Sequence, residues 1–121
     1  MLRRLLLINP AHMVDGARHA GPAQFPIPPL NLCYVAALTP GDWTMRMIDE
    51  NLRLEDGTAW EPNLVGITAL TPSAPRAYEL AARYRSQGAA VVLGGIHTSM
   101  VPDEAAQYAD SVVVGEAESV W

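Results

Sequence analysis

The 121-residue chain contains no lysine, and all eight of its basic residues are arginines. This absence excludes a phosphate-loop lysine, a Schiff-base lysine and a lysine general base within the chain. Thirteen acidic residues give a net charge of −5, and the arginines form no cluster in the sequence. We therefore expect no electrostatic surface for nucleic acid.

Cysteine and long apolar runs are also scarce. Cys33 is the only cysteine, which excludes a disulfide framework, a zinc site of several cysteines and an iron–sulfur cluster in this chain. The burial habits of free cysteine predict a buried position on a helix. No run approaches the roughly 20 apolar residues of a membrane span. The apolar part of the opening MLRRLLLINP is too short for a secretory signal. We expect no membrane association and a cytoplasmic location.

What the chain does contain is a series of short apolar runs bounded by glycine, proline and polar turns. These runs predict five buried strands, at residues 5–8, 44–48, 64–68, 90–93 and 111–114. Helices are predicted at residues 29–38 and 73–87, with a short one opening at Pro102. In the 73–87 helix, Ala77, Leu80, Ala81 and Tyr84 share one face, and Arg76, Glu79, Arg83 and Arg85 point elsewhere.

Strands that are apolar on both faces and separated by helices predict a parallel sheet with helices on both sides. We expect an α/β fold in a single domain, with a Rossmann-like, flavodoxin-like doubly wound sheet of strand order 2-1-3-4-5. The link between residues 49 and 64 leaves little room for a full helix. Residues 10–28 form a long irregular stretch with four prolines, and loops of this length are usually functional or disordered.

In such a sheet, ligands bind at the carboxyl ends of the strands. The predicted ends are Asn9-Pro10, the segment from Thr68 to Ser73, the segment from Gly94 to His97, and Gly115-Glu116. The turn after the first strand lacks G-x-G-x-x-G and a phosphate loop, so a dinucleotide site is not expected there. A receiver-type phosphorylation site is also excluded, because the third strand does not end in a carboxylate.

Each of these residues has a structural as well as a functional interpretation. The hydroxyls of Thr68, Thr71 and Ser73 suit either helix capping or the polar edge of a ligand. His97 fits a metal ligand, an acid–base group, a hydrogen-bond donor or a packed polar side chain, and Glu116 fits a helix N-terminal acid. His12 and His19 are expected to be solvent-exposed. No nucleophile–base pair or metal-ligand spacing stands out, so we do not expect this chain alone to be catalytic.

Six segments at the strand ends follow one another in a characteristic order: LLLINP, PPLNLCYVAALTP, MIDEN, LVGITALTPSAPRAYELAARYR, VVLGGIHTSMVPDEA and ADSVVVGEAE. In this order and spacing they resemble the N-terminal cobalamin-binding domain of radical S-adenosylmethionine enzymes. The resemblance implies a Rossmann-like sheet with the corrinoid over the carboxyl ends of the strands. The dimethylbenzimidazole tail would enter beside the ends of the third and fourth strands.

The same resemblance suggests eleven cofactor-binding residues. Thr68, Leu70, Thr71 and Ser73 would line the tail pocket, and Gly94, Gly95 and His97 would admit and contact the nucleotide loop. Gly115 and Glu116 would close the far wall, and Asn9, Pro10 and the proline-rich loop would border the corrin face. One departure stands out: the D-x-H-x-x-G motif, whose histidine binds cobalt in related domains, is absent. The expected lower face of the corrin therefore carries no protein histidine.

The resemblance further implies a parent enzyme whose catalytic part, with an iron–sulfur cluster and S-adenosylmethionine, lies downstream. Since VVVGEAESVW ends where a helix should begin, we expect residues 1–121 to be the N-terminal part of a longer enzyme. They would present a corrinoid to a radical domain of the same polypeptide. Two alternatives stay open: a cofactor-free Rossmann-like interaction domain, with residues 10–28 folded into the cleft, and a weaker one, a flavin or nucleotide binder.

Overall fold

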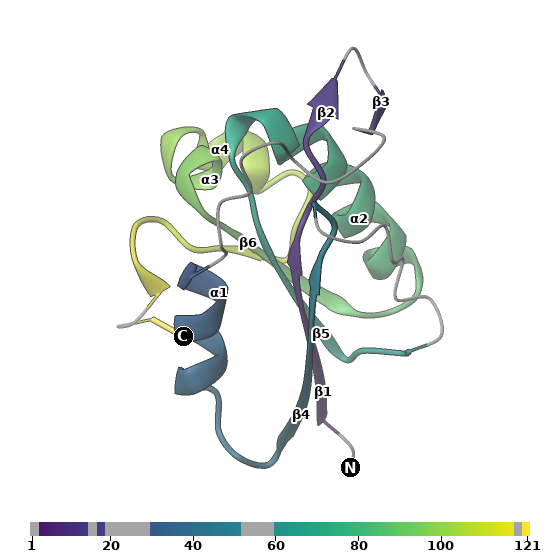
Figure 1. Ribbon diagram of the computed structural model, residues 1–121, viewed down its shortest axis with the longest axis vertical. Coiled ribbons are helices and arrows are strands. Elements are labelled where there is room, and N and C mark those ends of the chain that lie inside the picture. The colour runs from purple at the N-terminus through teal and green to yellow at the C-terminus, as the bar shows by residue number, and fades with distance from the viewer. Residues whose placement is uncertain (1–2, 15–16, 19–29, 52–59, 118–119) are drawn as a thin grey trace.

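A computed structural model of the chain describes residues 3–14, 17–18, 30–51, 60–117 and 120–121. Its centre is a five-stranded parallel sheet (Figure 1). In spatial order the strands are β4 (Trp43–Asp49), β1 (Arg3–Asn9), β5 (Leu64–Thr68), β6 (Ala90–Gly94) and β7 (Ser111–Val112). Counted along the chain, these five follow the order 2-1-3-4-5, so the predicted fold is confirmed.

β1 lies inside the sheet, between β4 and β5, and shows why the sequence has an unbroken apolar run. Leu5, Leu6, Leu7 and Ile8 are each at most 1% exposed. Successive side chains of a strand point to opposite faces, so Leu6 and Ile8 join the core on one side of the sheet and Leu5 and Leu7 the core on the other. A strand buried on both faces leaves no position for a polar residue.

A helix covers each face of the sheet. α1 (Leu30–Leu38) packs Leu32 against Leu5 and Leu7. α2 (Ala74–Ser86), preceded by the 3-10 turn η1 (Thr71–Ser73), covers the opposite face. The predicted apolar face of this helix is confirmed, because its four members are all buried: Ala77, Leu80, Ala81 and Tyr84. Each end of α2 lies one residue inside its predicted boundary.

Two short helices follow β6, and the sequence predicted only the second. α4 (Pro102–Ala105) opens at Pro102 as expected, whereas α3 (Ile96–Met100) was missed. Its sequence IHTSM contains residues of low helix propensity. The helix is instead fixed by tertiary contacts, such as the bond that the His97 amide donates to the carbonyl of Ala69 at 3.0 Å.

The segment after β1 was predicted to be irregular, but it contains a small antiparallel pair. β2 (Met13–Val14) pairs with β3 (Ala17–Arg18). The rest of this prediction, for residues 19–28, lies outside the described residues, as do residue 29 at the predicted helix start and most of the link at 52–59.

Helix α1 differs from the prediction in its burial. Cys33 lies on it but is exposed, so the expectation of a buried thiol was wrong. Leu32 is buried, whereas Leu30, Tyr34 and Leu38 are each at least 47% exposed. A helix that is apolar on all sides leaves large apolar side chains uncovered. Within the described part of the chain, no helix combines the length and apolar character needed to cross a membrane.

Candidate functional site

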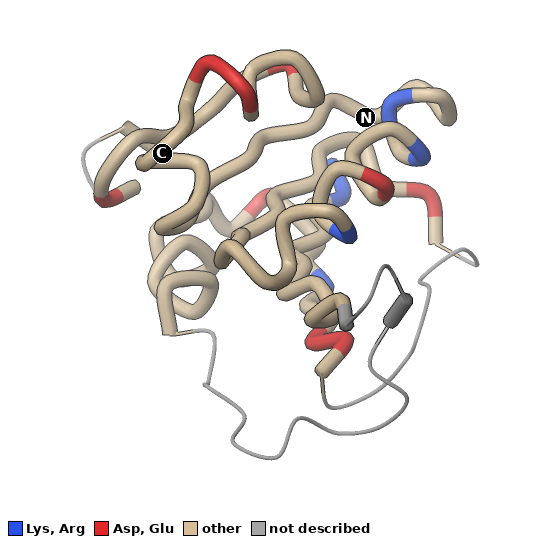
Figure 2. The backbone as a smooth tube through the Cα atoms, turned by 90° about the horizontal axis from the view of Figure 1, so that it is seen from above, with Lys and Arg blue, Asp and Glu red and all other residues tan. Residues whose placement is uncertain are grey.

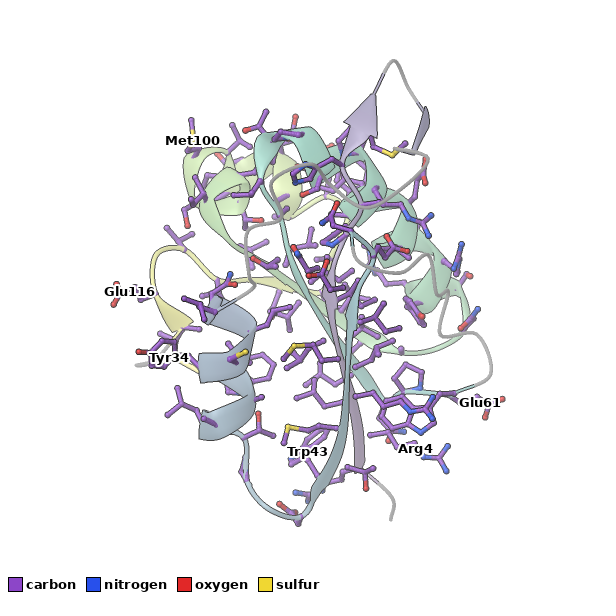
Figure 3. The ribbon with its side chains drawn as sticks, in the orientation of Figure 1. Arg4, Tyr34, Trp43, Glu61, Met100 and Glu116 are labelled. Atoms are coloured by element: carbon purple, nitrogen blue, oxygen red, sulfur yellow. The ribbon has the colours of Figure 1, made fainter. Side chains whose placement is uncertain are left out.

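A cavity of about 790 Å³ lies between α1 and the sheet and reaches the carboxyl ends of the strands. Its walls come from α1, from β1, β5 and β6, from α3 and from the segment after β7. Figure 3 shows Tyr34 of α1, Met100 of α3 and Glu116 of that last segment on the same side of the molecule. All three line the cavity, so they form part of its rim.

The structure brings most of the predicted site residues to this cavity. Seven of the eleven line it: Asn9, Thr68, Leu70, Gly94, Gly95, Gly115 and Glu116. They come from the ends of four neighbouring strands, as expected for a parallel sheet. The convergence is therefore observed, whereas the binding role of each residue stays a prediction.

The other four predicted residues do not line the cavity and have contacts within the protein. Ser73 is buried, and its hydroxyl both donates to the Leu70 carbonyl at 3.1 Å and accepts from the Leu70 amide at 3.0 Å. Ser73 therefore stabilises the turn at η1, whereas the predicted capping of α2 by its hydroxyl is not observed. The carbonyl of Pro10 accepts a hydrogen bond from the side chain of Asn51 at 3.0 Å. Thr71 and His97 bond to each other.

The two glycines at the end of β6 differ in their surroundings. At Gly94 an added Cβ would meet only the Cβ of Val113, at 3.8 Å, so this backbone borders open space. At Gly95, φ is +95°, and a Cβ would lie 2.7 Å from the backbone nitrogen and oxygen of Ala69 and from the Thr68 hydroxyl. The absence of a side chain at Gly95 thus allows the ends of β5 and β6 to pack in direct contact. At Gly94 it leaves only backbone at the cavity wall.

His97 connects three elements behind the cavity rim. Its Nδ1 lies 3.2 Å from the Thr71 hydroxyl and its Nε2 lies 3.1 Å from Oε2 of Glu104, which also accepts a hydrogen bond from the Tyr78 hydroxyl at 2.6 Å. The hydrogen bond from Tyr78, followed by that from His97, lowers the pKa of Glu104. Burial, with the neighbouring Glu104, raises the pKa of Tyr78. The ionised Glu104 of α4 therefore bonds to Tyr78 of α2 and to His97 of α3.

This contact predicts a weak acid dependence of stability. Because the folded-state pKa of Glu104 is lowered from its ordinary value of 4.5, its contribution is present above that value and disappears as the pH falls through the folded pKa. We expect wild type to have a higher urea midpoint than Glu104→Gln at pH 6, and the gap to shrink as the pH falls below 4.5 and through the folded pKa of Glu104. A gap that does not change with pH would contradict the role of the charge.

The end of β4 holds the loop that follows β1. Glu50 is buried, and its Oε1 accepts a hydrogen bond from the Ala11 amide at 3.1 Å. Asn51 accepts from the His12 amide at 3.1 Å and donates to Pro10. Both His12 and Asn51 line the cavity. His12 is therefore a wall residue rather than the simply exposed histidine that was expected, and His19 lies outside the described residues.

Arg76 was predicted to point away from the core, and this was wrong. Its side chain is 3% exposed and forms a two-pronged ion pair with Glu50, with Nε to Oε1 at 3.0 Å and Nη2 to Oε2 at 2.9 Å. Burial alone would lower the pKa of Arg76, but the hydrogen bonds and charges of Glu50 and Glu79 raise it overall. The pair joins α2 to Glu50, which lies just after β4 and also binds the loop that follows β1.

Several cavity residues were not predicted from the sequence. Asn31 lines the cavity and donates a hydrogen bond from Nδ2 to the Thr68 hydroxyl at 2.5 Å. Tyr34 and Leu38 face it from the same helix, and Trp121 closes it from the C-terminal segment. The signal in the sequence was the apolar run LNLCYVAAL, which has more large apolar residues than one buried helix face requires. Among the described residues, no group of three or more His, Cys, Asp or Glu could hold a metal ion.

Comparison with known proteins assigns this arrangement to a family. The family described as B12 binding domain matches residues 20–120. The chain belongs to the B12-binding domain family. Its match covers α1, the ends of β5, β6 and β7 and most of the cavity walls, whereas the cavity residues Leu7, Asn9, His12 and Trp121 lie outside it. No solved structure matches the chain.

The curated relatives of this B12-binding domain carry methyltransferase names. The bacteriochlorophyllide d C-8(2)-methyltransferase of Chlorobaculum tepidum is 41% identical over 81% of this chain and 22% of its own length. The C-12(1)-methyltransferase of the same organism is 33% identical over 98% of this chain and 26% of its own length. An uncharacterized methyltransferase of Pyrococcus horikoshii is 33% identical over 75% of this chain. The chain thus spans about a quarter of the length of the first two relatives.

Proposed function

We propose that this B12-binding domain holds cobalamin for a radical S-adenosylmethionine methyltransferase, and that it is the N-terminal part of that enzyme. A downstream iron–sulfur radical domain of the same polypeptide would use the corrinoid. The methyltransferase names of the relatives support methyl transfer as the reaction of the parent, and their greater length leaves room for a catalytic domain. The cytoplasm is the expected compartment.

The cavity at the strand ends is the observation that carries the proposal. Its volume of about 790 Å³ lies within the roughly 300–1,000 Å³ of small-molecule sites, which is enough for the nucleotide end of a corrinoid but not for the whole molecule. An added Cβ at Gly94 would have only one neighbour within 4 Å, and one at Gly115 would have none. Backbone without side chains therefore borders the space where a bulky ligand would enter.

Chemically different parts of the cavity suit different parts of cobalamin. Asn9, Asn31 and Thr68 offer amide and hydroxyl groups at the mouth, where the polar nucleotide loop would pass. The exposed apolar side chains of Ile96 and Met100 on the rim suit a flat macrocycle lying outside. Thr71, Ser73, His97 and Pro10 would act indirectly, by fixing the segments that carry these groups. When bound, cobalamin supplies the cobalt–carbon chemistry of methyl transfer.

The alternatives have less support. A cofactor-free interaction domain predicted a shallow or plugged cleft, and the described residues line an open cavity of about 790 Å³, so a shallow cleft is not supported. Residues 19–28, which were expected to fold into it, lie outside the described residues. A flavin binder would need a phosphate-cradling turn after β1, and that turn is instead held by Glu50 and Asn51. Figure 2 shows basic and acidic positions at several places along the described backbone, and the absence of a nucleic-acid partner stays a prediction. That no protein histidine binds the cobalt stays a prediction, and His12, which lines the cavity, is the residue to test.

The proposal predicts that filling the space beside Gly94 blocks the cofactor. The purified chain should bind hydroxocobalamin, and Gly94→Val should weaken binding by about tenfold or more, since its side chain would project into the cavity. Equilibrium dialysis followed at the visible bands of the corrinoid measures both. Gly41→Val is the matched control, because Gly41 also has open space around its Cβ position but is not part of the cavity wall. Wild type that folds but retains no cobalamin would contradict the proposal.

A further inference from the structure

The edge strand β4 exposes two methionines on the face of the sheet that α1 covers. Met45 is in register with Leu5 of β1, and Met47 is in register with Leu7. Residues in register on neighbouring parallel strands point to the same side of a sheet, and Leu5 and Leu7 belong to the core under α1. Met45 and Met47 are nevertheless 40% and 41% exposed. Edge strands usually carry charged side chains or proline, so two exposed thioethers at this position indicate a role in binding.

Helix α1 places a third sulfur at the same height along the strands. Leu32 packs in one cluster with Leu5 and Leu7, the residues with which the two methionines are in register. Cys33 follows Leu32 directly, and one residue advances an α-helix by only about 1.5 Å. The thiol of Cys33 is exposed, as the two thioethers are. The three sulfur-bearing side chains are therefore accessible at one level of the fold.

The helix also turns Cys33 toward β4. One residue rotates an α-helix by about 100°, so Asn31 and Cys33, which precede and follow Leu32, lie on opposite flanks of the side that faces the sheet. Asn31 lines the cavity and donates a hydrogen bond to Thr68 at the end of β5. Cys33 does not line the cavity. Since β4 and β5 lie on opposite sides of β1, the flank that carries Cys33 is the one over β4.

Sulfur ligands of this kind select a particular class of metal. Thiolates and thioethers are soft ligands, and copper(I) is the soft ion that prefers them. Thioethers are also a different ligand type from the imidazole, thiol and carboxylate groups considered above. Trp43 begins β4 (Figure 3) and lies two residues before Met45, so its side chain points to the same face. Its indole ring, which packs against the core under α1, is a fluorescent group beside the three sulfurs.

We propose that Cys33, Met45 and Met47 form a site for one copper(I) ion on the surface between α1 and β4. On binding, the thiol of Cys33 releases its proton to water. The thiolate and the two thioethers then donate electron pairs to the metal, whose oxidation state does not change. This set has one anionic ligand and neither imidazole nor carboxylate, so it is poorly suited to zinc(II). The site lies outside the cavity, and the inference does not depend on the proposed function.

The test is a titration of the reduced 121-residue chain with copper(I), without oxygen and in competition with a coloured copper(I) chelator. Wild type should take up one equivalent. Cys33→Ser, Met45→Leu and Met47→Leu should each weaken binding by about tenfold or more, because leucine keeps the volume of methionine but has no sulfur, and serine has no thiolate. Met100→Leu is the matched control: Met100 is 70% exposed but lies on α3, so this variant should bind copper(I) as wild type does.

A second measurement locates the metal. Silver(I), a soft ion that stays monovalent, should quench the tryptophan fluorescence of wild type, and Trp43→Phe should lose most of this quenching while keeping its affinity for the metal. Urea unfolding shows that each variant is folded. No uptake of copper(I) by folded wild type would overturn the inference, as would equal affinity for zinc(II). Wild-type affinity in both Met45→Leu and Met47→Leu would also overturn it, because the metal would then be held adventitiously by the thiol alone. None of these results bears on cobalamin binding.

Discussion

Replacing Gly95 by alanine should be among the most damaging single changes in this domain. The added Cβ would lie 2.7 Å from two backbone atoms of Ala69 and from the Thr68 hydroxyl, closer than real Cβ contacts. The residue would also hold a φ of +95°, which L-residues with side chains disfavour. Strain and forced separation together correspond to about 2–5 kcal/mol of lost unfolding free energy. Urea unfolding measures this loss.

The effect should extend to the proposed ligand. Moving Ala69 away from Gly95 would disturb two backbone bonds, from Ala69 to the Gly94 carbonyl and from His97 to the Ala69 carbonyl, each 3.0 Å long. Gly94 and Thr68 line the cavity, so cobalamin binding should fall as well. Gly88→Ala is the control, since Gly88 has a φ of +90° but no atom within 4 Å of its Cβ position. It should lose only about 1–2 kcal/mol. Equal losses in the two variants would show that the close approach is unimportant.

The second large effect is expected at the ion pair between Arg76 and Glu50. Their side chains are 3% and 1% exposed. Arg76→Met would remove the guanidinium that pairs with the buried Glu50 carboxylate, and breaking a buried ion pair typically lowers the unfolding free energy by about 3–5 kcal/mol. Because Glu50 also binds the amide of Ala11, the loop after β1 should loosen. We expect weaker cobalamin binding in the same variant.

A second substitution at Glu50 and a control at an exposed ion pair test this prediction. Adding Glu50→Gln to Arg76→Met removes the buried charge that has lost the guanidinium but keeps an oxygen for the Ala11 amide, so the double variant should regain part of the loss. Arg85→Met breaks the pair with Asp110, whose side chains are 42% and 46% exposed and 3.5 Å apart, and should cost less than about 1 kcal/mol. If Arg76→Met were as mild as Arg85→Met, the buried pair would not hold the loop. Urea unfolding of the four proteins measures the difference.

The strands were predictable because their signal is local. Runs such as the one from Leu5 to Ile8 are buried on both sides, so burial and sequence pattern coincide. The boundaries of β5 agree with the prediction, whereas β7 ends two residues earlier, at Val112. α3 escaped prediction because its helical conformation depends on contacts of Gly95 and His97 with Ala69 of another segment, and local propensity does not contain them.

The site was predictable only where it coincides with strand ends. Residues such as Thr68 and Gly94 follow apolar runs, and the parallel topology brings such ends together. Asn31 and Trp121 reach the same cavity from segments far from those ends in the sequence, so spacing gave no indication of them. Arg76 was misplaced for a related reason. An arginine on a helix is normally expected at the surface, and its partner Glu50 lies 26 residues away.

The exposed apolar side chains around the cavity affect how readily the protein aggregates and how much folded protein accumulates in a cell. Ile96 and Met100 are at least 63% exposed, and Leu30 and Tyr34 flank the same opening. Contiguous exposed apolar surface promotes aggregation when nothing covers it. A ligand that binds only the folded chain protects it by mass action. If cobalamin is that ligand, the vitamin would act as a folding aid as well as a reagent, and the amount of protein that accumulates would follow the vitamin supply.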